Sequence, residues 1–151
     1  MLDDTDRSLL RHLQADPAQN PSELAERVGI SRTKCARRLD RLMGQGILRG
    51  QSARIHWPAL GYNVAVSLRV NIEKSVPGAH DAFIAAARKV PEVLEIQTFL
   101  GRVDVRLKVV ARDMPHYQMV YRDRILNLPH IADIEALMHV TEVKSAGGVP
   151  L

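Results

Sequence analysis

The strongest constraint on this fold comes from a short stretch, residues 21–43, that combines two amphipathic helical patterns with a tight turn. The turn falls at Gly29, Ile30 and Ser31, where glycine favours the end of one helix and serine can cap the start of the next. The second helical pattern is crowded with arginine. A helix-turn-helix whose second helix is strongly cationic suits the major groove of DNA.

Basic residues are concentrated in the same part of the chain, although the net charge of the 151 residues is only +4. Between Arg27 and Arg54, eight lysines and arginines stand against one acid, Asp40. From Tyr62 onward, eleven basic and ten acidic residues nearly cancel. This asymmetry predicts a part that contacts phosphates joined to a part that does not. A solvated basic face without a partner is the alternative.

Three short helices are expected in the first 44 residues. Asp3 is a suitable N-cap for the first helix, Asn20 for the second and Ser31 for the third, and Gly29 is a natural end for the second. The third helix carries apolar residues at i, i+4, i+7 and i+8, which form one face. These residues are Cys35, Leu39, Leu42 and Met43. On this stripe, Cys35 is expected to be a small core residue rather than a redox sensor.

The opposite face of the third helix, which begins after its cap Ser31, is predicted to meet DNA. The N-terminal part of a recognition helix reaches base edges. Three residues are therefore expected near bases: Arg32, Thr33 and Arg37. Three others are expected near phosphates: Lys34, Arg38 and Arg41. Arginine suits guanine and phosphate equally well, so the division between the two sets stays open.

A short hairpin centred near Gly50 is expected over residues 47–55. In a winged helix, such a hairpin lays its arginines along the DNA backbone, which makes Arg49 and Arg54 candidates. Residues 56–61 are typical of a linker. The expected division is a DNA-binding domain over residues 1–55, this linker, and a second domain over residues 62–151.

The hydrophobic period changes in the second domain, where apolar and other residues alternate from 63 to 72 and predict a strand. Helices are expected over 82–90 and 114–126, and strands over 93–100, 103–110 and 131–143. Gly101 and Arg102 are expected to make a tight hairpin between the two middle strands. The order β-α-β-β-α-β predicts a ferredoxin-like α+β fold with both helices on one face of an antiparallel sheet. Apolar and small side chains on the other face predict self-association.

Several classes of function find no support in the composition. No apolar run is long enough to span a bilayer, and the first residues are acidic where a signal peptide would be basic, so a cytoplasmic protein is expected. The single cysteine, Cys35, excludes an intrachain disulfide and a cysteine-based zinc site. Neither metal-ligand nor catalytic-triad spacing relates the six histidines, and no metal, cofactor or catalytic residue is expected. The histidines are His12, His56, His80, His116, His130 and His139.

Short segments spread over nearly the whole chain match one family pattern in order and spacing. They are residues 2, 3 and 6, 23–31, 35–42, 46–48, 52–53, 59–61, 101–104, 143–144 and 150–151. With a winged helix-turn-helix followed by a β-α-β-β-α-β unit, the chain resembles the Lrp/AsnC (feast/famine) family of bacterial and archaeal transcription regulators. The resemblance implies a sequence-specific DNA-binding regulator that acts as a dimer or an assembly of dimers, often an octamer.

The resemblance also implies a small-molecule effector, because the second domain of the family, called RAM, commonly binds an amino acid at a subunit interface. The pocket would surround the hairpin, with Asp104 accepting from an α-ammonium group and Gly101 letting the backbone approach the ligand. The expected effector residues are Leu100, Gly101, Arg102, Asp104 and Ala136.

Several positions depart from the family pattern. Leu100 stands where threonine is usual, Val105 where an aromatic is usual, and Ala136 with Leu137 where hydroxyl residues are usual. Fewer hydrogen-bond donors would remain for a carboxylate or amino group. The departures predict one of three outcomes: an effector more apolar than usual, an acid held differently than in the family, or no small ligand. If there is no small ligand, Asp104 is a hairpin or interface carboxylate.

Two other functions fit the same layout. One is an architectural protein that wraps DNA through oligomers without an effector. The other is an enzyme similar to siroheme decarboxylases, which share the two-part organisation. The cationic third helix and the scattered histidines favour DNA binding over catalysis.

Overall fold

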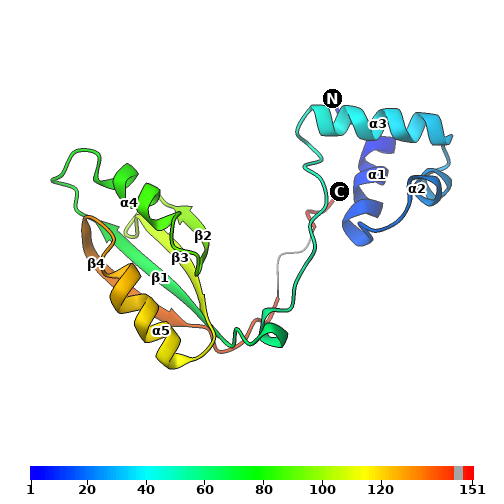
Figure 1. The fold of residues 1–151 in the computed structure, drawn as a ribbon. Helices are drawn as coiled ribbons and strands as arrows, with labels where there is room; N and C mark the ends of the chain where they lie inside the picture. The colour runs from blue at the N-terminus through cyan, green and yellow to red at the C-terminus, as the bar shows by residue number, and fades with distance from the viewer. Residues whose placement is uncertain (145–147) are drawn as a thin grey trace. The chain divides into compact units, whose positions relative to one another are not determined.

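The structure is a computed structural model that describes residues 1–144 and 148–151. It divides into an N-terminal unit, formed by residues 1–54 and the described residues from 143 onward, and a C-terminal unit of residues 55–142 (Figure 1). Residues 143–151 were expected in the second domain. They group with the helices because Arg11 Nε donates to the carbonyl of Leu151 and Gln14 Nε2 to that of Val149, both at 3.2 Å.

The N-terminal unit contains the three expected helices, α1 (Asp4–Ala15), α2 (Pro21–Val28) and α3 (Arg32–Gly44). Each begins at the predicted cap. Asp3 Oδ1 accepts from the Asp6 N–H at 2.8 Å, Asn20 accepts from two N–H groups of α2, and Ser31 accepts from the Lys34 N–H. These bonds satisfy backbone donors that a helix start otherwise leaves without partners. The core between the helices includes Leu9, Leu24, Ala25 and Cys35.

Two expectations for this unit are wrong. Met43 is 48% exposed rather than part of the buried face, which within α3 is formed by Cys35 and Leu42. Residues 47–55 form no strand, so the expected hairpin is absent from this structure. The N–H groups of Ile47 and Leu48 instead donate to the carbonyl of Leu42 at the end of α3. A two-stranded ribbon without a third strand is at best marginally stable, which explains the irregular backbone.

The C-terminal unit has the predicted β-α-β-β-α-β order. Its strands are β1 (Val64–Ile72), β2 (Val93–Thr98), β3 (Val105–Ala111) and β4 (Ile131–Met138). They form an antiparallel sheet in the order β2-β3-β1-β4. A 3-10 turn, η1 (Trp57–Leu60), precedes β1. The helices are α4 (Ala79–Ala87) and α5 (Met114–Val120), and α5 continues into a π turn, η2 (Tyr121–Ile125).

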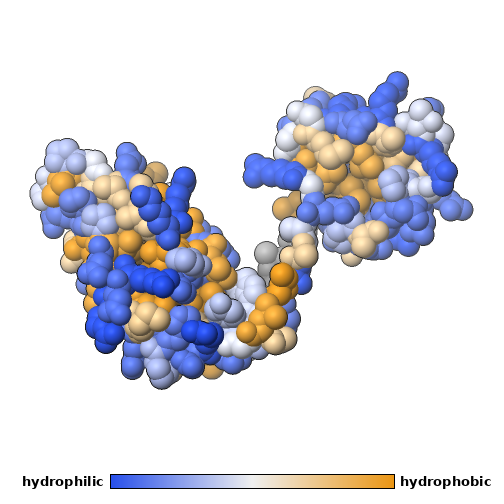
Figure 2. Space-filling model, in the orientation of Figure 1, coloured by the Kyte–Doolittle hydropathy of each residue, from blue (hydrophilic) through white to orange (hydrophobic). Residues whose placement is uncertain are grey.

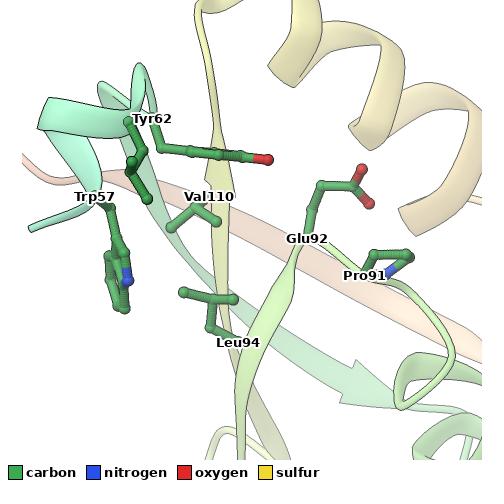
Figure 3. A pocket seen from close by; sticks show the side chains of 7 residues that line it. Trp57, Tyr62, Pro91, Glu92, Leu94 and Val110 are labelled. Carbon is green, nitrogen blue, oxygen red and sulfur yellow. The ribbon is translucent and has the colours of Figure 1, made fainter. Parts of the chain in front are cut away.

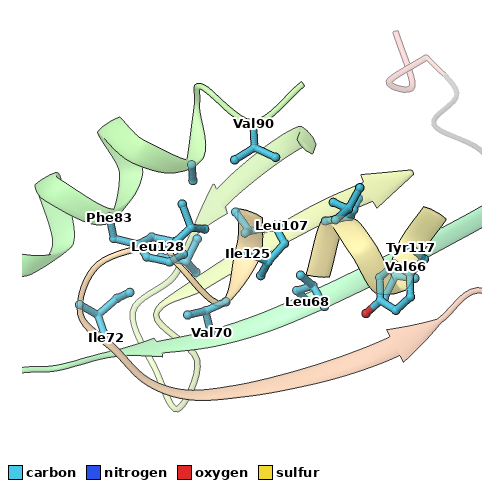
Figure 4. Close-up of a cluster of buried hydrophobic side chains, with 14 of the residues drawn as sticks. Val66, Leu68, Val70, Ile72, Phe83, Val90, Leu107, Tyr117, Ile125 and Leu128 are labelled. Carbon is cyan, nitrogen blue, oxygen red and sulfur yellow. The ribbon is translucent and has the colours of Figure 1, made fainter. Parts of the chain in front are cut away.

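One hydrophobic core joins this sheet to its helices. Val66, Leu68 and Val70 of β1 are fully buried against Phe83 of α4 and Ile125 of η2 (Figure 4). Both helices therefore cover the same face of the sheet, as the sequence predicted. The last strand is shorter than expected, because β4 ends at Met138 rather than at residue 143.

The opposite face of the sheet, called the open face here, is more polar than predicted. Its residues from β1 are those that alternate with the core: Ala65, Ser67, Arg69 and Asn71. Arg69 pairs with Glu135 of β4 at 3.4 Å, and Lys108 of β3 pairs with Glu95 of β2 at 3.3 Å. Large apolar side chains on this face are Leu137 of β4, opposite Ser67, and Val110 of β3, which lies with Leu94 where η1 meets the sheet. The alternating apolar residues of β1 face the helices instead, so they do not explain self-association.

Candidate DNA-binding helix and effector loop

The first turns of α3 expose a cationic surface. Ser31 caps the helix, while Cys35 and Leu42 anchor its inner face. This leaves four residues of the predicted DNA-contact set exposed: Arg32, Thr33, Lys34 and Arg37. In the part of the chain that the structure describes, no ion pair occupies the three basic side chains among them. They are therefore available to an anionic partner.

Arg38 and Arg41, further along α3, have partners within the protein. Arg38 Nη1 lies 2.7 Å from Asp3 Oδ2 and 2.8 Å from Asp6 Oδ1, and Arg41 Nη2 lies 2.5 Å from Asp6 Oδ2. The Asp6 side chain is 0% exposed. Two guanidinium groups of α3 thus hold one buried carboxylate of α1. The phosphate contacts expected of Arg38 and Arg41 would have to compete with these ion pairs.

Electrostatic contacts keep the side chains of Asp3, Asp6, Arg38 and Arg41 ionised. Burial opposes the charge on Asp6, but the hydrogen bonds from Arg38 and from the Asp3 N–H outweigh it and hold the pKa of Asp6 below its usual value. The Asp6 N–H and Arg38 likewise lower the pKa of Asp3. Hydrogen bonds to Asp3 and Asp6 raise the pKa of Arg38. The cluster, here called the Asp6 cluster, consists of Asp3, Asp6, Arg38 and Arg41.

The predicted wing arginines lie outside regular structure. Arg49 and Arg54 are both exposed, in the irregular segment after α3. The structure therefore gives no strand that would fix their direction relative to α3.

Four of the five predicted effector residues lie in the loop between β2 and β3. This loop is longer than the tight turn expected at Gly101 and Arg102, because it spans residues 99–104 and is closed by a 2.9 Å hydrogen bond from the Phe99 N–H to the Asp104 carbonyl. The Leu100 side chain is completely exposed at its tip. A Cβ built on Gly101 would contact nothing within 4 Å. No packing within the described chain therefore requires glycine there.

Asp104 is engaged by the end of β1. Its Oδ2 accepts from the Ile72 N–H at 2.9 Å, and its Oδ1 lies 3.7 Å from Lys74 Nζ. The register between β1 and β4 shifts at this point, between Asn71 and Ile72. Asp104 thus supports an irregular strand end with one oxygen, and its other oxygen faces the ammonium of an exposed lysine.

Ala136 lies apart from that loop within one chain. It is exposed on β4 opposite Leu68, four residues along β1 from Ile72. At about 3.3 Å per residue, this corresponds to about 13 Å along the strand. The five predicted effector residues therefore do not line one pocket in a single chain.

A shallow hollow of about 160 Å³ lies elsewhere in the C-terminal unit, where η1 meets the open face (Figure 3). Trp57, Tyr62, Leu94 and Val110 provide its mainly apolar wall. Its one carboxylate, Glu92, is held by Arg124 at 2.5 Å. Its walls come from three separate segments, residues 57–62, 91–94 and Val110, so no local sequence pattern predicted this hollow.

A capped three-helix unit with an exposed cationic helix, joined to a separate ferredoxin-like unit, defines a DNA-binding regulator with a second domain for ligands or assembly. Two family models match the chain: "Winged helix-turn-helix DNA-binding" over residues 2–49 and "Lrp/AsnC ligand binding domain" over residues 65–149. The chain belongs to the Lrp/AsnC family of transcriptional regulators.

Relatives and solved structures agree with this assignment. The chain is 32% identical to the leucine-responsive regulatory protein of Salmonella typhimurium over 145 residues, which are 96% of this chain and 88% of that protein. The corresponding protein of Klebsiella pneumoniae is 31% identical with the same coverage. A transcriptional regulator from Neisseria meningitidis in complex with L-Met superposes with a TM-score of 0.92 at 31% identity, covering 99% of this chain and 97% of that one. An AsnC family regulator from Agrobacterium tumefaciens gives 0.89 at 28% identity, with the same coverage.

The protein is therefore a DNA-binding transcriptional regulator with a ligand-binding domain, and not an enzyme. Within the described residues, no helix is both long and apolar enough to cross a membrane. The same residues contain no cluster of three or more side chains suited to a metal ion.

Proposed function

We propose that the protein recognises specific DNA sequences through α3 and that a small amino-acid-like effector, bound by the C-terminal unit, controls this binding. The observation that carries the proposal is the exposed cationic start of α3, where Arg32, Lys34 and Arg37 have no acidic partner among the described residues. An N-terminal, capped and outward-facing position is where recognition helices carry residues that reach base edges.

The proposed DNA-contact set has two parts. Ser31, Arg32, Thr33, Lys34 and Arg37 would meet bases and adjacent phosphates from α3. Arg49 and Arg54 would follow the DNA backbone from the segment after it. Arg38 and Arg41 are left out of this set, because the Asp6 cluster accounts for them.

The DNA proposal is tested with the variant Arg37→Ala. If Arg37 makes a bidentate contact with a base, its loss should weaken binding to a selected duplex by about 1–3 kcal/mol and relax specificity at one position. The duplex is the one that the parent protein enriches from a random-sequence pool, and affinity is measured by fluorescence anisotropy. Arg88→Ala removes the same charge from an exposed position in the C-terminal unit and should bind like the parent. Parent-like affinity in Arg37→Ala would contradict the assignment of α3.

For the effector, we propose a site completed by a second subunit around Leu100, Gly101, Arg102, Asp104 and Ala136. The complex of the Neisseria meningitidis regulator with L-Met supports an amino acid as the ligand class. Leu100, Val105 and Ala136 supply no hydrogen-bonding side chain, which favours an apolar amino acid. The ligand would act by binding two oligomers, or two arrangements of one oligomer, with different affinities.

A regulator without an effector is the second candidate, and the contacts of Asp104 favour it. Both carboxylate oxygens already face groups of the same chain, the Ile72 N–H and Lys74 Nζ. In that case the protein would organise DNA through its oligomers alone, as an architectural protein.

The variant Asp104→Asn separates the two candidates. Asparagine keeps an oxygen for the Ile72 N–H but removes the charge that would hold an α-ammonium group. A thermal-shift screen with L-Met, L-Leu and other amino and keto acids should raise the melting temperature of the parent and not of the variant, with unchanged DNA affinity without ligand. Equal shifts in both would place the effector elsewhere. No shift in either would favour the architectural protein.

Assembly and location complete the proposal. The protein would act as a dimer or an assembly of dimers, because helix-turn-helix proteins of this kind read two half-sites. Since its relatives include bacterial DNA-binding regulators, we place its action in the cytoplasm.

A further inference from the structure

Three basic residues lie along one flank of α3, at i, i+4 and i+7: Lys34, Arg38 and Arg41. Residues with this spacing share one side of a helix. The flank borders the start of α1, since Asp3 and Asp6 reach Arg38 across it. A protein that needed only positive charge against DNA would leave all three exposed.

The structure neutralises two of these three charges. Asp6 is fully buried and contacts both arginines, while Asp3 contacts Arg38. Two carboxylates therefore balance two guanidinium groups. The side chains of Arg38 and Arg41 remain 27% and 45% exposed, so they lie near the surface and could turn toward a phosphate if they were released.

We propose that Asp6 is a positioning residue that masks Arg38 and Arg41, and so confines the DNA-facing charge of α3 to Arg32, Lys34 and Arg37. The same contacts join the start of α1 to the middle of α3 and thereby fix the orientation of α3, the proposed recognition helix. Masking these two charges lowers the affinity for DNA of any sequence. Discrimination between sequences is then left to the residues at the start of α3. This inference rests on the proposed use of α3 to contact DNA.

The salt dependence of DNA binding measures the masking directly. Each phosphate that a cation neutralises adds about 0.9 to the slope of log K against log salt concentration. A masked arginine contributes nothing to that slope, and a released one contributes fully. A role in folding alone would change affinity without steepening the slope.

The first experiment compares the parent with Asp6→Asn on two duplexes, the one enriched by the parent and a scrambled duplex of equal length. In the folded variant, we expect a slope steeper by about 0.9, because Arg41 loses its only carboxylate partner while Asp3 still holds Arg38. We also expect several-fold tighter binding to the scrambled duplex and a lower ratio of specific to non-specific affinity. The charge-balanced double variant, with Asp6→Asn and Arg41→Gln, keeps the Asp3–Arg38 pair and should return the slope to the parent value. A parent slope in the folded Asp6→Asn variant would overturn the proposal.

A second comparison decides the matter if Asp6→Asn does not fold. Lys34→Gln, at the exposed residue of this flank, should lower the slope by about 0.9, whereas Arg41→Gln should leave it unchanged. Equal losses in the two variants would show that Arg41 meets phosphate, which overturns the masking and leaves the proposed function intact. If neither variant changed slope or affinity, α3 would not contact DNA, and the proposed function itself would fail.

Discussion

Asp6, the third residue of α1, serves two parts of the fold with one carboxylate. Its Oδ2 accepts from the Asp3 N–H at 3.2 Å and completes a reciprocal cap at the start of the helix. The same carboxylate binds two guanidinium groups of α3. A buried charge is tolerated only when it is paired and hydrogen-bonded, and every contact here meets that condition.

Acid should therefore destabilise the N-terminal unit through Asp6 and Asp3. Both have a pKa below the ordinary 3.8 in the folded protein. Such a group contributes stability that is complete above its unfolded pKa and is lost as pH falls through the folded pKa. The free energy of unfolding of the parent should thus decrease as pH falls below about 4. Urea denaturation followed by circular dichroism, at several pH values, measures it.

Asp6→Asn should be less stable than the parent by about 2 kcal/mol at pH 7, because it loses hydrogen bonds between charged groups in a buried position. Its stability should also depend less on pH below 4. Asp4→Asn is the control, since it removes an exposed carboxylate from the same helical turn. If Asp6→Asn and the parent lose stability in parallel as pH falls, Asp6 is not the group that titrates.

At the scale of the elements, local signals predicted structure well. The caps at Asp3, Asn20 and Ser31 and the end of α2 at Gly29 could be predicted, because capping depends on residues within four positions of each other. The order of strands and helices followed from the change in hydrophobic period after residue 62. Such patterns report which side of an element is buried.

Contacts between distant residues could not be predicted in this way. Arg38 looks like any exposed arginine in the sequence, and only the packing of α1 on α3 brings Asp6 to it across 32 positions. Asp104 was expected to hold an effector, and its contact with Ile72 could not be predicted because it depends on how the ends of β1 and β3 meet. The chain pattern also could not show that residues 47–55 lack the neighbouring strand that a stable hairpin needs.

Gly29 gives an element-scale prediction because it ends α2 in the left-handed region, at φ 73°. Alanine at this angle costs about 1 kcal/mol, so Gly29→Ala should lower the free energy of unfolding by about that amount. Gly44 has an ordinary φ, and a Cβ there would contact nothing within 4 Å. Gly44→Ala should therefore be neutral or stabilising by up to about 1 kcal/mol. Urea denaturation of both variants tests the contrast, and equal losses would contradict it.

For the whole molecule, the apolar surface of the C-terminal unit bears on assembly. In Figure 2, orange apolar residues lie among blue polar ones on the surface of this unit. The open face carries the charges of Arg69 on β1 and of Arg106 and Lys108 on β3, but large apolar side chains are also exposed in the unit. They include Trp57, Leu60 and Leu94, which surround the hollow at η1. An apolar patch bordered by polar residues is typical of a protein interface. We therefore expect a second copy to pack against this hollow and not against a row of apolar side chains along β1.

Multi-angle light scattering at micromolar concentration should therefore find a dimer or an even multiple of it, and Leu94→Glu should shift the population toward smaller species. A carboxylate in the hollow would be buried if the second copy packs there, and Lys108, whose Nζ lies over the Trp57 ring, already pairs with Glu95, so dissociation should become at least about tenfold easier, equivalent to about 1.4 kcal/mol. Gln97→Glu adds the same charge to an exposed position on β2, away from the residues of the hollow, and should leave the mass unchanged. A monomeric parent would refute assembly altogether. An unchanged mass in Leu94→Glu would move the interface away from η1, toward the exposed loop that carries Leu100.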